Sequence, residues 1–141
     1  MRFIYNLGRA AVGCSISLAC HTALADVVVV VSATSPVTVL NPQQIAAIFL
    51  GNNARLPNGE QAVPLDQAEG SAARDEFYAK FTGKSAAQMK AHWSKIIFTG
   101  RGQPPKELPL SADVKKQLIT NPNAIGYIEK NMVDATVRVV N

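Results

Sequence analysis

The sequence predicts an α/β fold, a three-layer sandwich around a mixed, mostly parallel sheet. Five consecutive valines, Val27–Val31, are β-branched and show no polar alternation. This pattern is typical of a strand buried on both faces inside a parallel sheet. Later segments with helical spacing alternate with short strand-like segments, as in α/β proteins. The last two predicted strands are joined by a short turn, which allows part of the sheet to be antiparallel.

Residues 1–25 are predicted to be a secretory signal peptide rather than part of the fold. Two arginines near the start precede a mostly apolar stretch of small residues, 10–24. Ala23-Leu24-Ala25 forms an A-x-A-like cleavage site before Asp26. The apolar stretch is too short and too polar for a comfortable membrane span. We therefore expect a periplasmic protein with no membrane span after cleavage.

The cysteines leave an alternative to this cleavage. Lipidation at Cys20 is the competing interpretation, although Ser17 stands where a lipobox requires Leu or Val. With cleavage after residue 25, both Cys14 and Cys20 are removed and 26–141 forms a single domain without cysteine. Such a domain can form no disulfide and can use no thiol nucleophile.

The charge of the chain gives no indication of a nucleic-acid partner. The full sequence has 14 basic and 10 acidic residues. Without Arg2 and Arg9 the balance is 12 against 10, a formal charge of +2 (12 − 10). The lysines and arginines are scattered, so they form no basic patch of the kind that binds nucleic acid.

The first predicted helix follows the valine strand. Asn41 is a good N-cap, Pro42 fits the first helical position, and Gln44 completes a capping box. Gly51 suits the position just after the last helical turn. The buried face carries Ile45, Ile48 and Phe49.

A short strand is predicted over 62–66, and a helix from Ser71 ends at Gly83. Three residues at helical spacing form its buried stripe: Ala73, Phe77 and Phe81. Four charged residues are expected to face water: Arg74, Asp75, Glu76 and Lys80.

The next predicted helix spans 85–98 and is capped by Ser85. Its inward stripe contains Met89, Trp93 and either Ile96 or Ile97. Residues 99–109 are predicted to be a loop, because they are rich in glycine and proline.

The last predicted helix begins with Ser111 as its cap and stops at Pro122. Strands are predicted over 124–129 and 135–140, joined by 130–134. The core is expected to come from the valine strand and these side chains: Ile45, Phe49, Phe77, Phe81, Trp93, Ile97, Leu118, Ile125 and Tyr127.

Four motifs in this order resemble the periplasmic phosphate-binding proteins of ABC transporters. They are IAAIFLGN, EGSAARDEF, the tryptophan of HWSK, and NPNAIGYIE, and together they cover most of residues 26–141. IFLG and AIGYIE are fairly specific in that order. Members of the family have two α/β lobes with the ligand in the cleft between them. The resemblance therefore implies that this chain is a short relative with one lobe of a periplasmic-binding-protein-like fold.

The resemblance also implies a phosphate loop at the start of one helix. The family's Gly-Ser-Gly-Thr loop falls on Gly70-Ser71-Ala72-Ala73, where only the first two residues match. Ala73 lacks the threonine hydroxyl. The family arginine that precedes the loop by four positions falls on Gln67, so its charge is lost as well.

The residues themselves support an anion site at this loop. A helix N-terminus presents unpaired N–H groups and about half a positive charge. We expect the amides from Gly70 to Ala73 to cradle an oxyanion, with the Ser71 hydroxyl and the Gln67 amide as further donors. Ser71 can also be a plain N-cap, and the two roles are compatible. Arg101 lies between two glycines, so it either closes over the site or is a solvated loop residue.

Two carboxylates near the loop have two interpretations each. Asp66 or Glu69 can accept a hydrogen bond from a protonated phosphate, which sulfate cannot offer. Alternatively, both simply favour the positive end of the helix, at about 0.3–1 kcal/mol each.

The hypothesis that follows is a periplasmic binding module for phosphate or a similar oxyanion, linked to phosphate ABC transport. A single lobe supplies one wall of a cleft, so a second copy or an envelope protein would complete the site. The alternative is a partner-binding or sensory domain that has lost its ligand. An enzyme is not expected, because His92 has no evident Ser or Asp partner. No cofactor or metal is expected either, since one histidine and scattered acids make no ligand pattern.

Overall fold

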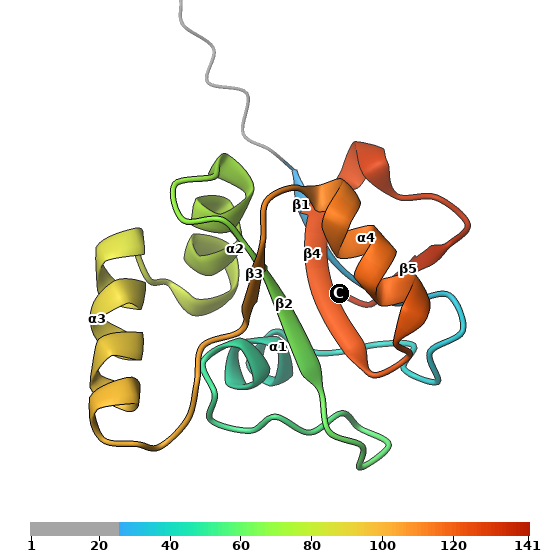
Figure 1. Ribbon diagram of the computed structural model, residues 1–141. Helices are drawn as coiled ribbons and strands as arrows, with labels where there is room; N and C mark the ends of the chain where they lie inside the picture. Colours follow the sequence, from blue (N-terminus) through green and yellow to red (C-terminus); the bar gives the residue numbers. More distant parts are fainter. Residues whose placement is uncertain (1–25) are drawn as a thin grey trace, which may run out of the picture.

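The computed structural model describes residues 26–141, and the predicted signal peptide lies outside them (Figure 1). The elements along the chain are β1 (Val27–Ser32), α1 (Pro42–Phe49), β2 (Val63–Gln67), α2 (Ala72–Thr82), α3 (Ala86–Phe98), β3 (Lys106–Leu108), α4 (Ser111–Thr120), β4 (Ala124–Glu129), a 3-10 turn (Lys130–Met132) and β5 (Val137–Val139).

The five strands form one open sheet in the order β3-β2-β4-β1-β5. β2 pairs in parallel with β3 and β4, whereas β1 is antiparallel to both β4 and β5. Four strands therefore point the same way and β1 is reversed, which confirms a mixed, mostly parallel sheet. The valines of β1 are buried on both faces, as expected. The prediction that this strand has parallel neighbours was wrong, since both of its neighbours are antiparallel. A strand buried on both faces lacks polar alternation in either kind of sheet, so the valine pattern does not indicate strand direction.

The short connection after β4 does not make a hairpin. β4 and β5 lie on opposite sides of β1, so the chain crosses from one side of that strand to the other between residues 129 and 137. The reversed strand is therefore β1. β4 and β5 run in the same direction, but β1 lies between them and they share no hydrogen bonds as a strand pair.

Helices cover both faces of the sheet (Figure 1). Val27, Val29 and Val31 pack with residues of α1, α2 and α3 on one face. Val28 and Val30 pack against the other face, which α4 covers. The single strand β1 thus contributes to two cores, and the three layers match the predicted sandwich.

The backbone of β1 is completed by side chains where β5 does not reach. The Val27 N–H donates to Glu76 Oε1 at 3.1 Å, and Lys80 Nζ donates to the Val27 carbonyl at 3.1 Å. The Val29 N–H donates to Asn141 Oδ1 at 2.8 Å. Glu76 was expected to face water, and its binding to β1 corrects that expectation.

Helix starts follow the capping residues in three cases. Asn41 and Ser85 both make full capping boxes, and Ser71 accepts a hydrogen bond from the Arg74 N–H. The fourth expectation was wrong: α4 begins at Ser111, and Leu110 in front of it makes no side-chain cap. The Ser111 hydroxyl is engaged by other side chains, described below.

Several smaller expectations also need correction. Ile97 is 54% exposed, and its neighbour Ile96 packs against the core instead. β3 lies within the predicted loop 99–109, because a three-residue strand leaves no readable alternation. His92, for which the sequence favours an exposed position on a helix, is partly buried, with Nε2 at 2.8 Å from the Leu50 carbonyl oxygen at the end of α1.

Candidate functional site

The predicted phosphate loop connects β2 to α2. Parallel sheets place such connections at the carboxyl edge, where α/β proteins bind ligands. Gly70 has φ +88°, a left-handed conformation that side chains other than hydrogen rarely adopt. Ser71 then takes an extended conformation and caps α2. The loop therefore turns sharply and starts a helix, as the sequence predicts.

Some amides of this loop already have acceptors. The Ser71 N–H donates to the Ala68 carbonyl at 3.1 Å, and the Arg74 N–H donates to Ser71 Oγ at 3.2 Å. The Glu69 N–H donates to Glu107 Oε1 at 3.0 Å.

The amides of Gly70, Ala72 and Ala73 donate to no acceptor within residues 26–141. Gly70 and Ala72 are exposed, whereas Ala73 is buried. The Ser71 hydroxyl accepts from the helix and keeps its own proton for a ligand. Three unbonded amides and one hydroxyl at a positive helix end form the anion-binding part of the predicted site.

Asp66 faces the interior rather than the loop. It is 1% exposed, and Tyr78 Oη donates to its Oδ2 at 2.6 Å while Tyr127 Oη donates to its Oδ1. The Gln67 N–H also donates to Oδ1, at 2.8 Å. Burial raises the pKa of Asp66, and the tyrosine hydrogen bonds oppose that rise. Because its oxygens are used inside the fold, Asp66 is not placed to accept a hydrogen bond from a protonated phosphate, whereas its charge interaction with the helix end stays a prediction.

Burial, with the Asp66 charge beside them, also raises the pKa of both tyrosine hydroxyls. Tyr78 and Tyr127 therefore stay protonated and act as donors to the carboxylate. The cluster anchors β2 to α2 and β4 directly beneath the loop.

Arg74 turns back toward β2 instead of facing water. Its Nη1 donates to Glu107 Oε1 at 2.7 Å and to the Gln67 carbonyl at 3.1 Å, and its Nη2 lies 3.7 Å from Asp66 Oδ2. The side chain is only 14% exposed. Arg74 thus places a guanidinium beside the loop, but two carboxylates already balance its charge.

Gln67 lies on the opposite face of β2 from Asp66, because successive strand residues alternate. Its Nε2 donates to Ser111 Oγ at 2.9 Å and to the Tyr127 carbonyl at 3.0 Å. Ser111 in turn donates to Glu129 Oε2. Both amide hydrogens of Gln67 are used in this way, so it is not placed to donate to an anion at the loop.

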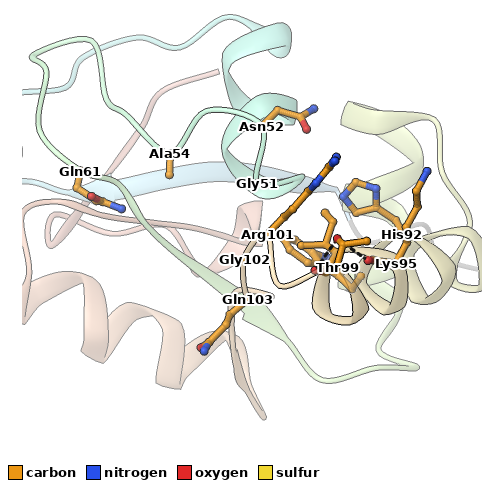
Figure 2. Close-up of a pocket in the computed structure, with 12 residues that line it drawn as sticks. Gly51, Asn52, Ala54, Gln61, His92, Lys95, Thr99, Arg101, Gly102 and Gln103 are labelled. Atoms are coloured by element: carbon orange, nitrogen blue, oxygen red, sulfur yellow. Dashed lines mark hydrogen bonds between the residues drawn. The ribbon is translucent and has the colours of Figure 1, made fainter.

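Arg101 lies near the start of β2, at the opposite end of this strand from the loop. It lines a cavity together with Gly51, Gln61 and Lys95 (Figure 2). Gln61 precedes β2 and Ser71 follows it. A five-residue strand separates these positions by about 17 Å. None of residues 66–73 lines this cavity. The structure therefore does not bring Arg101 together with the loop.

Glu69 is exposed beside Gly70, so both of its interpretations remain predictions. The residue that sequence reasoning missed is Glu107, which binds both the Glu69 amide and Arg74. It lies in β3, and the pairing of β3 with β2 brings it there. A strand signal at 106–108 would have been needed to find it.

Over the described part of the chain, no group of three or more His, Cys, Asp or Glu side chains is arranged to hold a metal ion. No helix between residues 26 and 141 is long and apolar enough to cross a membrane.

This fold is similar to that of solved structures described as phosphate transport proteins. One is a protein from Clostridium perfringens, described as a phosphate ABC transporter substrate-binding protein with bound phosphate. It has a TM-score of 0.64 and 22% identity, and the match covers 82% of this chain and 44% of that chain. An ABC-type phosphate transport receptor from Vibrio cholerae has a TM-score of 0.64 and 18% identity, covering 82% and 45%.

PstS from Borrelia burgdorferi has a TM-score of 0.61 and 12% identity, covering 82% and 46%. No protein-family model and no curated protein matches the sequence. The likeness therefore lies in the fold: this chain has one lobe of a periplasmic-binding-protein-like architecture and spans less than half the length of these neighbours. They are transport binding proteins rather than enzymes.

Proposed function

We propose that this chain is a periplasmic solute-binding-like protein that binds phosphate or a similar oxyanion at the start of α2, in connection with phosphate ABC transport. The observation that carries the proposal is the set of unbonded amides at Gly70, Ala72 and Ala73, beside the Ser71 hydroxyl. They lie at the carboxyl edge of parallel strands in a fold shared with a phosphate-bound neighbour.

The same geometry predicts weak binding by the isolated chain. The loop forms one wall, and the nearest guanidinium, that of Arg74, is shared with Asp66 and Glu107. A site open on one side buries less of its ligand than most small-molecule sites do. We expect a dissociation constant on the order of 1 mM for phosphate, or about −4 kcal/mol. A second copy or an envelope protein would supply the other wall. Leu110, which is 63% exposed and follows β3, could give such a partner an apolar contact at the carboxyl end of the parallel strands.

The decisive experiment removes one amide and leaves the helix in place. Proline is tolerated at the first helical position and has no N–H group. Ala72→Pro should therefore keep α2 and weaken phosphate binding about tenfold, the cost of one hydrogen bond to a charged group. The chain offers a matched control, because α3 also starts with Ser-Ala-Ala. Ala86→Pro should leave phosphate binding unchanged.

Phosphate is titrated into isotope-labelled protein, and the amide shifts of Gly70 and Ala73 are followed by NMR, because both amides are present in every variant. Shifts confined to the loop, with an affinity about tenfold weaker in Ala72→Pro and unchanged in Ala86→Pro, support the proposal. Equal binding by parent and Ala72→Pro would contradict it. A sulfate titration tests Glu69, because the oxygens of Asp66 are used by two tyrosines. Equal binding of sulfate and phosphate is expected if Glu69 only favours the helix end, and weaker binding of sulfate if Glu69 accepts a hydrogen bond from a protonated phosphate.

One observation favours a second candidate, a partner-binding or sensory domain that has lost the ligand. The position of the family arginine is held by Gln67, whose amide binds Ser111 and Tyr127 instead of facing the loop. Under this hypothesis the edge carrying the loop contacts a protein rather than an anion. Absence of loop shifts at millimolar phosphate, together with loop shifts on adding a purified envelope partner, would favour it.

A further inference from the structure

A cavity of about 590 Å³ lies at the opposite end of β2 from the phosphate loop (Figure 2). Its walls come from the last turns of α3, from the loop that follows α3 and from the connection between α1 and β2. This volume is within the range of small-molecule sites, about 300–1,000 Å³. It is also far larger than an inorganic ion requires, so a ligand here would have a body as well as a head group.

The charged side chains that line the cavity are all basic. Lys95 and Arg101 line it together with His92, and no Asp or Glu is among the lining residues of the described chain. In Figure 2 the Arg101 side chain extends toward Asn52 and His92. The cavity therefore has a positive lining without a compensating carboxylate.

The guanidinium of Arg101 has no use inside the fold. Arg55, Arg74 and Arg138 each donate at least one hydrogen bond to a carbonyl or carboxylate. Among the four arginines between residues 26 and 141, Arg101 alone donates none through its side chain and forms no ion pair. Lys95 likewise makes neither kind of contact within the described residues.

Lys95 lies in the last turn of α3, but its ammonium group makes no hydrogen bond to a helix carbonyl within the described residues. α1 and α3 both end at the cavity, and helix C-termini attract positive charge. Three carbonyls near these helix ends already have side-chain donors: His92 binds the Leu50 oxygen, and the Thr99 hydroxyl binds the Lys95 and Ile96 oxygens. The positive groups of Lys95 and Arg101 thus remain available to a ligand.

Trp93 gives the cavity an aromatic wall. It lines the same cavity, is only 7% exposed, and its buried Nε1 has no hydrogen-bond partner in the described structure. An aromatic wall suits a ligand that has a flat body. The Trp93 N–H group is enclosed by protein atoms, so its resonance reports on contact with this wall rather than on a hydrogen bond to the ligand.

We propose that this cavity is a second binding site, for a small phosphate monoester with an aromatic or flat apolar body. A phosphate monoester carries about −1.5 to −2 charges at neutral pH, which matches the two cations of Lys95 and Arg101. The body packs on Trp93, and the amides of Asn52, Gln61 and Gln103 line the remaining wall. This site is independent of the phosphate loop.

The test uses phenyl phosphate as the probe and the indole N–H resonance as the readout. Trp93 is the only tryptophan of the sequence, so its resonance is unambiguous. Phenyl phosphate should shift this resonance in a saturable way, at least about tenfold more tightly than inorganic phosphate does. Arg101→Gln should weaken phenyl phosphate binding about tenfold, since it removes a hydrogen bond to a charged group.

A matched control removes a charge elsewhere. Lys116 is exposed on α4, which covers the other face of the sheet, and Lys116→Gln should leave the titration unchanged. Ala72→Pro should also leave it unchanged, which separates this site from the phosphate loop. The proposal is overturned by an unshifted indole resonance, by equal binding in parent and Arg101→Gln, or by losses of equal size in Lys116→Gln or Ala72→Pro.

Discussion

Removal of one buried hydroxyl should show how strongly the fold depends on the Asp66 cluster. In Tyr127→Phe the ring remains, and so does its stacking on Phe77, with centroids 4.0 Å apart and planes 3° from parallel. The change removes the Tyr127 hydroxyl, which donates to Asp66 Oδ1 and accepts a hydrogen bond from the Gln67 backbone N–H at 3.1 Å. The Gln67 N–H still has Asp66 Oδ1 at 2.8 Å, so the main loss falls on the carboxylate.

The expected cost is about 1.5–3 kcal/mol in the free energy of unfolding at neutral pH, the range for a hydrogen bond to a charged group. Urea denaturation of parent and Tyr127→Phe measures it from the midpoint at constant slope. Tyr78→Phe is a matched variant, because Tyr78 Oη donates to the other oxygen at 2.6 Å and should cost a similar amount.

The pH dependence gives the sharper test. Burial raises the folded-state pKa of Asp66 above 3.8, so the folded state binds the proton more tightly than the unfolded state. This group therefore adds stability as the pH falls through its folded pKa. A hydrogen bond to the neutral carboxyl is worth only about 0.5–1.5 kcal/mol, so the cost of Tyr127→Phe should shrink on acidification. A cost below about 0.5 kcal/mol at neutral pH, or one that grows in acid, would refute the reasoning.

Two further predictions concern other parts of the fold. A Cβ at Gly126 would lie 2.6 Å from Val114 Cγ1, so Gly126→Ala should destabilise the protein by about 1–3 kcal/mol in urea denaturation. Val114→Ala in the same chain should recover part of that loss. Strictly additive costs of the two substitutions would contradict this packing. Hydrogen bonds from Lys115 and Thr136 lower the pKa of Asp134 to about 2, so the stabilising contribution of this group is lost as the pH falls from about 4 to 2. Carboxyl NMR should show this titration midpoint, and the midpoint should rise in Lys115→Met. An unchanged midpoint in the variant would contradict the role of Lys115.

Local signals in the sequence identified most elements, because capping and turn residues act on their immediate neighbours. Asn41, Ser71 and Ser85 start helices where they were expected to, and Gly83 ends α2 with φ +68°. Strand direction was not accessible in this way. The valines of β1 report burial on two faces, and only pairing with distant strands decides whether the neighbours are parallel.

The candidate site was predictable where it depends on a single turn and not where it depends on partners. Gly70 and Ser71 form the expected loop. Asp66 and Gln67 are adjacent in sequence, but the alternation of β2 sends them to opposite faces, where each finds partners more than 40 positions away. Arg101 follows α3, and this 13-residue helix places Arg101 at the opposite end of β2 from the loop. Such positions are set by the packing of whole elements, which no local pattern encodes.

The placement of β1 also bears on when the chain can acquire its native state. This strand pairs only with β4 and β5, and its hydrogen bond from Val29 to Asn141 spans 112 positions. While the polypeptide is being synthesised, the valines therefore have no strand to pair with until β4 and β5 have left the ribosome. Contacts of such long range form slowly.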